Sequence, residues 1–404
     1  MIKKNMKRKT IAMILCFAMV FTTTASVQMA GTVDASGITK TSYSKMTRGV
    51  WIAFCDFKSL GLYNKSKSTY TKNVNSILKK SKADGCNTVY FHVRAFDDAA
   101  WSSSTFRASE YLMSGAHEYK NAKAAYSALG YDPFGVFVSR ASAYGMKVEA
   151  YMNPYRVTYS KFLDPSSTYS RQRIYKAVRE IKKYNISGIH FDDYFYHSSS
   201  GKYIYTTSAS KYSKNPSGKL KYRKGLTAAK KRSYCNTMVR GVYNTTHYGT
   251  SSSVKARTRT KSNSIKFGIS PAGNYSNCMA AGADVKSWLS KSGYIDYCAP
   301  QIYWTNKYKV NGKYQSMYSN RLSQFTKLNK IGIPMYIGLA LYRTGTKDAN
   351  DKGWSISTSN IKSQVVSLRS KGSEGYILFS GANIKSTKSA TQKEIKNLKS
   401  INGI

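Results

Sequence analysis

The sequence predicts an α/β fold, a single (β/α)8 TIM barrel with long loops on the catalytic face. Strand-like and helix-like segments alternate along nearly the whole 404-residue chain, and eight such repeats are the number that closes a barrel of this kind. A doubly wound open sheet is the main alternative. No glycine-rich phosphate loop follows the first predicted strand, which makes that alternative less favoured.

The predicted strands are short segments rich in apolar, β-branched and aromatic residues. They are Gly49–Cys55, Thr88–Arg94, Lys147–Met152, Ser187–Asp192, Lys266–Ser270, Tyr294–Tyr303, Pro334–Leu341 and Gly375–Phe379. Segments between and after them repeat apolar residues at helical spacing. They are Thr71–Ala83, Pro133–Tyr144, Arg171–Tyr184, Ala228–Thr245, Asp284–Ser290, Asn320–Leu328, Asn360–Ser370 and Ala390–Lys399.

The second predicted strand indicates which side chains face the centre of the barrel. Alternate residues of a strand point to opposite faces, so Val89, Phe91 and Val93 share one face, and His92 and Arg94 share the other. The outer face of a barrel strand packs under helices and is apolar. We therefore expect His92 and Arg94 to point inward.

The third and fourth predicted strands alternate in the same way. Glu149, Tyr151 and Asn153 have inward parity in the third strand, and His190 and Asp192 have it in the fourth. Barrel enzymes place their catalytic groups at the C-terminal ends of the strands. Asp192 occupies such an end, so we expect it in the mouth of the barrel.

The expected neighbours of Asp192 in the mouth are Arg94 and Asn153, from the two preceding strands. Asp193 has the opposite parity and could turn either way as the strand ends. A satisfied ion pair between Arg94 and Glu149 is the alternative account of charged residues inside the barrel.

The N-terminal 35 residues have the pattern of a secretory signal peptide. Basic residues precede an apolar stretch from Ile11 to Phe21, and Val33-Asp34-Ala35 offers small residues for cleavage. The stretch is shorter than the ~20 residues that span a bilayer. We expect residues 1–35 to be removed, residues 36–404 to form one domain, and the mature protein to be secreted and cell-wall associated, with no transmembrane segment.

The composition is strongly basic. Without residues 1–35 the chain has 59 Lys and Arg against 18 Asp and Glu, a net charge of +41. Nucleic-acid-binding motifs are not evident, so no nucleic-acid partner is predicted. Anionic cell-wall polymers or membrane lipids are the expected counter-ions, and a generally basic, solvated surface is the alternative account of the charge. The five cysteines after residue 35 form no close pairs, and histidines are few, so we expect no disulfide framework, metal or cofactor.

The segment from Gly188 to Tyr196 carries the strongest functional signal. A short apolar strand runs into Asp192 and Asp193, followed by Tyr194, Phe195 and Tyr196. Carboxylates serve as acid, base or nucleophile at a glycosidic bond, and aromatic rings stack on sugars. Asp192 and Asp193 are therefore the predicted catalytic residues, with a polysaccharide as substrate.

Polar and aromatic residues at other strand ends are predicted to bind that polysaccharide. Amides and guanidinium groups can hydrogen-bond sugar hydroxyl or acetamido groups, and aromatic side chains can stack on the rings. The predicted substrate-binding residues are Arg94, Asp97, Asn153, Tyr155, Arg156, Tyr194, Tyr196, Gln301, Tyr303 and Trp304.

Seven motifs, in this order along the chain, resemble one family. They are Arg48 to Trp51, Asn87 to Arg94, Tyr131 to Pro133, Asn153 to Arg156, Gly188 to Tyr196, Gly268 to Pro271 and Pro300 to Trp304. The chain is similar to the glycosyl hydrolase-like family 10 domain of bacterial envelope proteins. The resemblance implies a (β/α)8 barrel and glycoside hydrolysis, some members being similar to enzymes that cut peptidoglycan glycan strands. His92 and Glu149 depart from the Gln and His that the family usually has there.

The mechanism stays open between two routes. A retaining site needs a second carboxylate about 5–5.5 Å away and an inverting site one about 6.5–9.5 Å away, and the seventh strand ends without a Glu. Asp192 could be a nucleophile with Asp193, Asp97 or Asp98 as acid. Alternatively one Asp donates a proton while the other orients a substrate N-acetyl group that attacks the anomeric carbon.

Three long loops are predicted above the site, and they either wall a cleft or are plain insertions: Phe96–Asp132, His197–Lys224 and Thr305–Ser319. The Ser-rich run Ser251–Ser264 is predicted on the opposite face, as a linker without chemistry. The sequence thus predicts a secreted glycoside hydrolase acting on N-acetylated cell-wall glycan, most plausibly peptidoglycan. A non-catalytic cell-wall glycan- or polyanion-binding barrel is the alternative.

Overall fold

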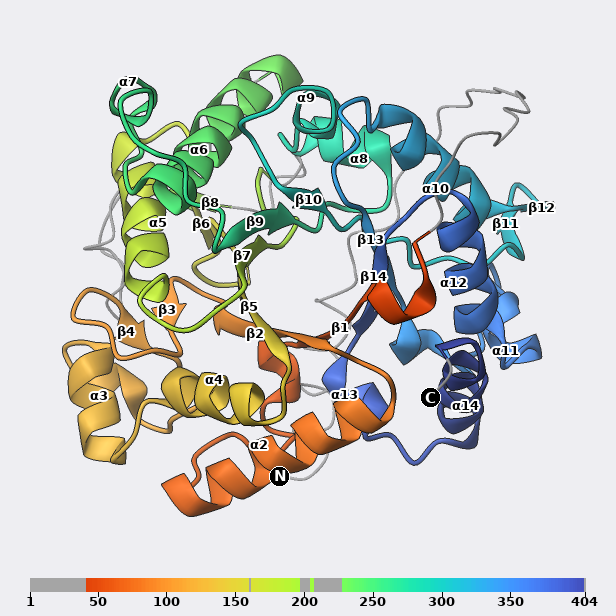
Figure 1. Cartoon of the computed structure of the whole chain (residues 1–404), viewed down its shortest axis with the longest axis horizontal. Coiled ribbons are helices and arrows are strands. Elements are labelled where there is room, and N and C mark those ends of the chain that lie inside the picture. Colours follow the sequence, from red (N-terminus) through yellow and green to blue (C-terminus); the bar gives the residue numbers. More distant parts are fainter. Residues whose placement is uncertain (1–40, 160, 197–203, 207–226, 403–404) are drawn as a thin grey trace. The chain divides into compact units, whose positions relative to one another are not determined.

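A computed structural model describes residues 41–159, 161–196, 204–206 and 227–402. Its centre is a barrel of eight parallel strands surrounded by helices (Figure 1). The barrel strands are β1 Thr47–Ile52, β2 Thr88–Arg94, β5 Lys147–Met152, β7 Gly188–Phe191, β9 Lys266–Ile269, β10 Tyr297–Cys298, β13 Tyr336–Leu339 and β14 Gly375–Phe379. The predicted signal peptide lies outside the described residues.

The strands pair in the order β10-β9-β7-β5-β2-β1-β14-β13. Single parallel bridges from Cys298 to Met335 and from Gln301 to Gly338 join the two ends of this order. The predicted (β/α)8 barrel is therefore confirmed.

The predicted strand Tyr294–Tyr303 is much shorter in the structure, where only Tyr297 and Cys298 form a ladder. Pro300 has no N–H to donate, and beyond it the chain continues through the bridges of Gln301. The first strand also ends earlier than predicted, at Ile52, because residues 54–56 form a 3-10 helix.

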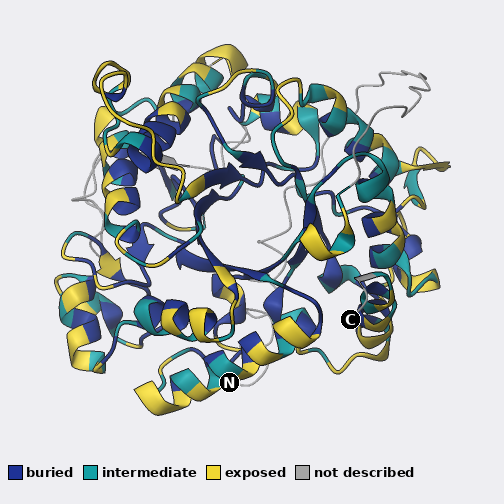
Figure 2. Cartoon of the chain, in the orientation of Figure 1, coloured by how far each residue is buried: buried dark blue, intermediate teal, exposed yellow. Residues whose placement is uncertain are grey.

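Helices cover the outside of the barrel, with buried inner faces and exposed outer faces (Figure 2). They are α2 Lys67–Ala83, α3 Ala122–Leu129, α4 Pro133–Ala143, α5 Thr168–Ile181, α6 Ala228–Tyr248, α7 Ser253–Ala256, α8 Tyr275–Ala280, α9 Val285–Trp288, α10 Met317–Leu328, α11 Gly353–Ile356, α12 Asn360–Ser370, α13 Gly381–Ile384 and α14 Ser389–Asn402. Local sequence starts several of them: Asp132 accepts from the backbone of Phe134 and Gly135, and Pro133 occupies the first turn of α4.

The predicted alternation holds through most of β2. Phe91 points outward, where its ring stacks near Phe57 and packs on Phe134 and Phe137 of α4. The inward residues form a mainly aromatic core: Trp51, Ala53, Tyr90, Tyr151, Tyr297, Ala299 and Ile377.

The long loop Phe96–Asp132 is structured: it contains the two-residue strands β3 Asp98–Ala99 and β4 Arg107–Ala108, the 3-10 helix η3 Ala116–Glu118, and α3. The loop Thr305–Ser319 contains the antiparallel hairpin β11 Tyr308–Val310 and β12 Lys313–Gln315. In these two regions the plain-insertion alternative is therefore wrong. Most of His197–Lys224 lies outside the described residues, apart from β8 Ile204–Thr206, which pairs with β6 Lys161–Leu163.

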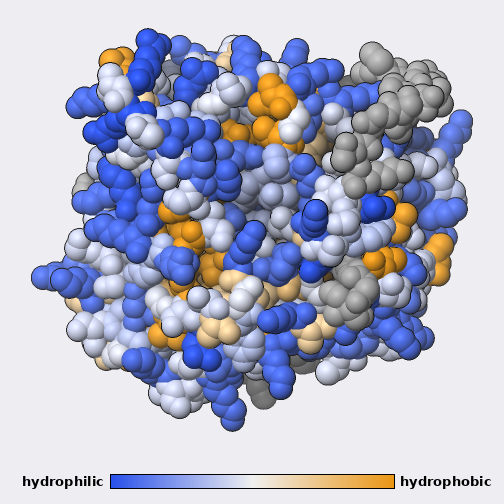
Figure 3. All heavy atoms as spheres, viewed as in Figure 1, coloured by the Kyte–Doolittle hydropathy of each residue, from blue (hydrophilic) through white to orange (hydrophobic). Residues whose placement is uncertain are grey.

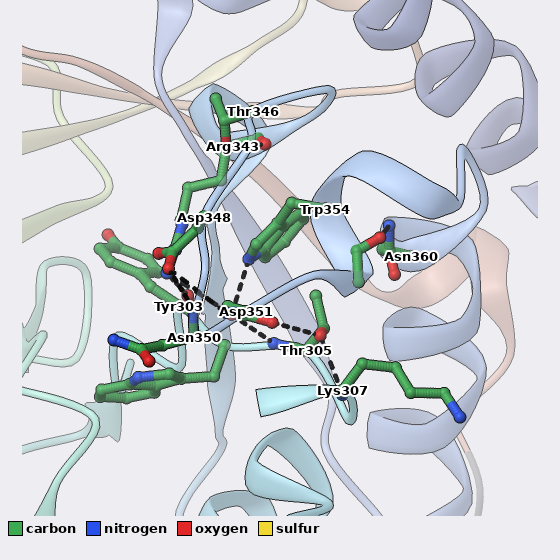
Figure 4. Close-up of polar contacts among 12 residues, drawn as sticks. Tyr303, Thr305, Lys307, Arg343, Thr346, Asp348, Asn350, Asp351, Trp354 and Asn360 are labelled. Atoms are coloured by element: carbon green, nitrogen blue, oxygen red, sulfur yellow. Dashed lines mark hydrogen bonds and ion pairs between the residues drawn. The ribbon is translucent and has the colours of Figure 1, made fainter. Parts of the chain in front are cut away.

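Asp351 ties the loop after β10 to the loop after β13 (Figure 4). Its carboxylate accepts hydrogen bonds from the backbone N–H of Thr305 at 3.1 Å and from Trp354 Nε1 at 3.0 Å. Arg343 lies 3.6 Å from the same carboxylate and also donates to the carbonyl oxygen of Tyr303 at 3.0 Å. This cluster fixes the backbone that carries Tyr303.

The face in Figure 3 is mostly hydrophilic, with scattered small hydrophobic groups. In the described part of the chain, no helix combines the length and hydropathy needed to span a bilayer. Four of the five cysteines in that part of the chain, Cys86, Cys235, Cys278 and Cys298, are buried.

Candidate active site

Asp192 directly follows β7 and lies in the mouth of the barrel, as its parity predicts. Its backbone N–H donates to the carbonyl of Met152, which extends the β5–β7 ladder by one residue. The carboxylate is buried and accepts three hydrogen bonds: from Tyr151 Oη at 2.5 Å, Gln301 Nε2 at 2.8 Å and the backbone N–H of Asp193 at 2.9 Å. Burial raises the pKa of Asp192, and these hydrogen bonds oppose the rise.

Asp193 also faces the mouth, which resolves the direction that the sequence left open. Its side chain is half-buried and shares a hydrogen bond with the Asp192 carboxyl group. Burial and then the neighbouring Asp192 raise the pKa of Asp193 well above its ordinary value. Two neighbouring carboxyl groups cannot both ionise readily, and the rise in pKa is greater for Asp193 than for Asp192.

Arg156 provides the positive charge of the site. Its buried guanidinium lies 4.1 Å from the ring centre of Tyr194, and it lowers the pKa of both Asp192 and Asp193. Arg156, Tyr194 and Gln301 therefore belong to the site that the sequence predicted.

Buried and half-buried aromatic residues extend the mouth in two groups. The first aromatic group follows β1, β2 and β5 and contacts Arg156 through Phe96 and Tyr159. Its members are Phe54, Phe96, Tyr111 and Tyr159, with ring-centre distances of 4.8–6.4 Å. The second aromatic group follows β10, β13 and β14. Its members are Tyr303, Tyr342 and Phe379, with ring-centre distances of 5.9–6.2 Å.

Tyr303 connects the second aromatic group to the carboxyl pair. Burial raises the pKa of its hydroxyl, followed by its neighbours Tyr342, Asp192 and Asp193. Of these seven aromatic residues, only Tyr303 was among the predicted site residues. The others lie in loops or at strand ends, where a single aromatic residue is as typical of core packing as of a binding site.

Arg94 lies away from the mouth, so its predicted place beside Asp192 is wrong, and Asp97, predicted to bind substrate, is paired with two arginines instead. The β2–β5 register shifts by one residue between His92 and Arg94, which places Arg94 opposite the outward-facing Met152. The fully buried Arg94 forms an ion pair with Asp97, which also pairs with Arg173 of α5 at 2.7 Å. The predicted alternative ion pair of Arg94 with Glu149 is wrong too.

Other predicted site residues are packed beneath the mouth. Tyr196 donates from its hydroxyl to Asp164 at 3.0 Å, and Tyr155 is fully buried near Tyr196. Trp304 packs over Gly273, and Asn153 is buried, its side-chain amide donating to the carbonyl of Ala95 at 2.9 Å. In the segment Asn153 to Arg156, therefore, Arg156 belongs to the mouth, whereas Asn153 and Tyr155 are buried.

Glu149, Tyr297 and His190 form a second polar cluster, the floor cluster, deeper in the barrel. Tyr297 Oη donates to Glu149 Oε2 at 3.0 Å and lies 2.9 Å from Nδ1 of His190. Burial raises the pKa of Glu149 to about 8 and lowers that of His190 to about 3, so both are neutral near pH 7. Glu149 fits because Gly188 has no Cβ, which would collide with its carboxyl group.

Half of the chain matches the model of a known family. A model of the Glycosyl hydrolase-like 10 family matches residues 153–356, half of the chain, including the carboxyl pair and Gln301. The chain belongs to this family. The resemblance seen in the motifs is therefore confirmed, and the site described above lies in a glycosyl hydrolase-like 10 barrel.

Curated relatives match over most of the chain. Glycosyl hydrolase DigH of Escherichia coli strain K12 is 26% identical over 378 residues, which is 78% of this chain and 77% of the relative. Glycosyl hydrolase YngK of Bacillus subtilis strain 168 is 26% identical over 346 residues, covering 73% of this chain and 61% of the relative.

Solved structures share the fold at low identity. The endo-1,4-β-mannanase from Rhizomucor miehei has a TM-score of 0.53 and 9% identity, over 94% of this chain and 100% of that one. The PgaB (BpsB) glycoside hydrolase domain from Bordetella bronchiseptica has a TM-score of 0.50 and 12% identity, over 87% and 99%. The family match identifies the protein as glycoside hydrolase-like. These solved structures show the same barrel fold.

Proposed function

We propose that this protein is a secreted glycosidase that hydrolyses N-acetylated cell-wall glycan strands, with Asp193 as acid and Asp192 as its partner. The observation that carries the proposal is the pair itself: two carboxyl groups in hydrogen-bond contact at the mouth of a glycoside hydrolase-like barrel. Asp192 accepts three hydrogen bonds, and the raised pKa of Asp193, caused by burial and by Asp192, suits it to donate a proton.

The contact between the two carboxyl groups favours the substrate-assisted route. Carboxylates that act from opposite sides of a glycosidic bond are about 5–9.5 Å apart, whereas these two touch. The alternative acids are engaged elsewhere: Asp97 pairs with two arginines, and Asp98 accepts from the backbone N–H groups of Ala95 and Phe96. The pair thus acts from one side, and the attacking oxygen comes from the substrate.

The reaction runs in two balanced steps. Asp193 gives its proton to the leaving glycosidic oxygen while the acetamido carbonyl oxygen of the substrate attacks the anomeric carbon. Asp192 then accepts a hydrogen bond from the acetamido N–H and stabilises the positive charge of the cyclic intermediate. Water opens that ring, returning a proton to Asp193, so the product keeps its anomeric configuration.

The two aromatic groups favour an extended glycan over a short sugar. They follow strands on the rim from β5 round to β10, and most of these residues are half-buried. Such rings suit stacking on successive sugars. The predicted signal peptide and the +41 charge support the remaining parts of the proposal, secretion and retention on an anionic cell wall.

The test compares product release from two matched polymers, purified glycan strands with intact N-acetyl groups and the same strands after de-N-acetylation. We expect cleavage of the first only, because an ammonium group has no carbonyl oxygen to attack and places a positive charge beside a cationic intermediate. The Asp192→Asn variant should lose cleavage by ~10²–10⁴-fold, with Glu149→Gln as the matched control that stays active.

Two outcomes would contradict this assignment. Equal cleavage of both polymers would remove the substrate-assisted route and leave Asp192 as a protein nucleophile. Binding of glycan without products, by the wild type and by Asp192→Asn alike, would favour the alternative of a non-catalytic glycan-binding barrel.

A further inference from the structure

A groove of about 750 Å³ lies outside the barrel, along α6 and between α5 and the turn that leads to α7. It is separate from the carboxyl pair, none of whose residues lines it. This region is at the upper left of Figure 1, where the surface in Figure 3 is mostly hydrophilic. The polar residues that matter here are Arg171, Arg232, Ser233, Asn236, Arg240 and Ser252.

Positive charge dominates the groove. Three arginines line it, and Asp284 is the one acidic residue among its lining residues. That carboxylate is already engaged, because it accepts from Asn236 Nδ2 at 2.7 Å and caps α9 through the backbone N–H of Ser287. An anionic ligand would therefore meet little repulsion.

The arginines are held in place with donors to spare. Arg232 donates from Nη1 to the carbonyl of Met279 at 3.2 Å, and Arg240 donates from Nη2 to the Tyr294 hydroxyl at 2.8 Å while packing on its ring. Arg171 donates from Nη1 to the carbonyls of Pro165 and Ser166 and from Nη2 to the hydroxyl of Thr168. Each guanidinium keeps N–H groups that make no hydrogen bond within the described residues, and such groups bind phosphate strongly.

The sequence around the groove is depleted of acid over a long stretch. No Asp or Glu occurs between Asp193 and Asp284, a segment that includes all of α6 and α7. Arg232 and Arg240 are eight residues apart, which is about 12 Å along a helix. Two fixed charges at that spacing suit a ligand with several anionic groups in a row.

We infer that this groove binds a linear polyol-phosphate polymer, a chain of phosphodiesters without bases. The inference deepens the wall-retention part of the proposed function and is independent of catalysis. Nucleic acid fits less well, because bases need open aromatic faces. Of the two groove tyrosines, Tyr294 is covered by Arg240, and Tyr175 is buried with its hydroxyl donating to the carbonyl of Thr237.

The experiment titrates the mature protein with poly(glycerol phosphate), with a single-stranded oligo(dT) and with hyaluronan at several salt concentrations. The groove variant Arg171→Gln/Arg232→Gln/Arg240→Gln should bind poly(glycerol phosphate) at least about tenfold more weakly than the wild type. The matched control Lys72→Gln/Lys79→Gln/Lys396→Gln removes the same charge from exposed positions on α2 and α14. It should stay within about threefold, because diffuse surface charge contributes little per residue.

Equal weakening in the groove variant and the control would overturn the inference in favour of diffuse charge. Groove-dependent binding of oligo(dT) or hyaluronan as tight as that of poly(glycerol phosphate) would overturn the phosphodiester-polymer assignment. If the triple variant does not fold, Arg232→Gln alone replaces it and is compared with Lys72→Gln alone: the first should weaken binding about threefold and the second should leave it unchanged. The groove variant should cleave short soluble glycans as the wild type does, and Asp192→Asn should bind the polymer normally, so failure of either proposal is seen separately.

Discussion

The mouth and the floor of the barrel both bury a carboxyl group whose pKa is raised by burial. Glu149 in the floor cluster is enclosed by the aromatic core and accepts a single side-chain hydrogen bond, from Tyr297. Asp193 in the mouth is half-buried, touches a second carboxyl group and lies near Arg156. A raised pKa is common to both sites, but only the mouth offers a proton where a substrate can reach it.

The difference teaches that access and partners separate a catalytic acid from a protonated core residue. When Asp193 loses its proton, the guanidinium of Arg156 can stabilise the resulting negative charge. Glu149 has neutral neighbours, since His190 is held unprotonated by burial. Ionising Glu149 would therefore place an uncompensated charge in the core.

Substitution of the carboxyl group in the mouth should have the largest effect. Asp193→Asn should lower kcat by ~10²–10⁴-fold, because an amide cannot donate a proton to the leaving oxygen. Glu149→Gln should change kcat less than about twofold, since it only replaces one neutral group by another. Product release from N-acetylated glycan strands measures both. An active Asp193→Asn variant would show that the acid lies elsewhere.

The pH dependence of the unfolding free energy tests the ionisation of Glu149 in the floor cluster. The pKa of Glu149 is about 8 in the folded protein against an ordinary value of 4.5, so its stabilising contribution is complete below about pH 4.5 and is lost as the pH rises through about 8. Between pH 5 and 9 the wild type should lose on the order of a few kcal/mol of unfolding free energy relative to Glu149→Gln. Denaturant unfolding across this range measures the difference. Parallel pH profiles for the two proteins would refute the raised pKa of Glu149.

The smallest expected effect concerns the donor that holds the mouth pair. Tyr151→Phe removes the hydrogen bond that lowers the pKa of Asp192, so that pKa should rise and the acidic limb of kcat/KM should move to higher pH. We expect kcat to fall about tenfold. Tyr297→Phe, the matched change in the floor, should leave the pH–rate profile in place. A shift in both variants would indicate that floor and mouth are coupled.

Much of this comparison could be predicted from the sequence. Inward parity placed Asp192 in the mouth and Glu149 inside the barrel, and Gln301 emerged from its motif. Arg94 could not be placed, because one extra residue between two strands reverses every parity beyond it. The partner of Asp97 is Arg173, far along the chain, and no local pattern indicates that contact. Tyr151 was given inward parity, but its hydrogen bond to Asp192 depends on the tertiary structure.

The Asp351 cluster has a consequence for motion. Because Arg343 bonds the carbonyl of Tyr303, and Asp351 bonds Thr305 and Trp354, the segments after β10 and β13 are cross-braced at several points. The segments that carry Tyr303 and Tyr342 should then move together as one rigid unit rather than independently. The amide proton of Thr305 should exchange with solvent slowly, on the timescale of concerted opening of both segments.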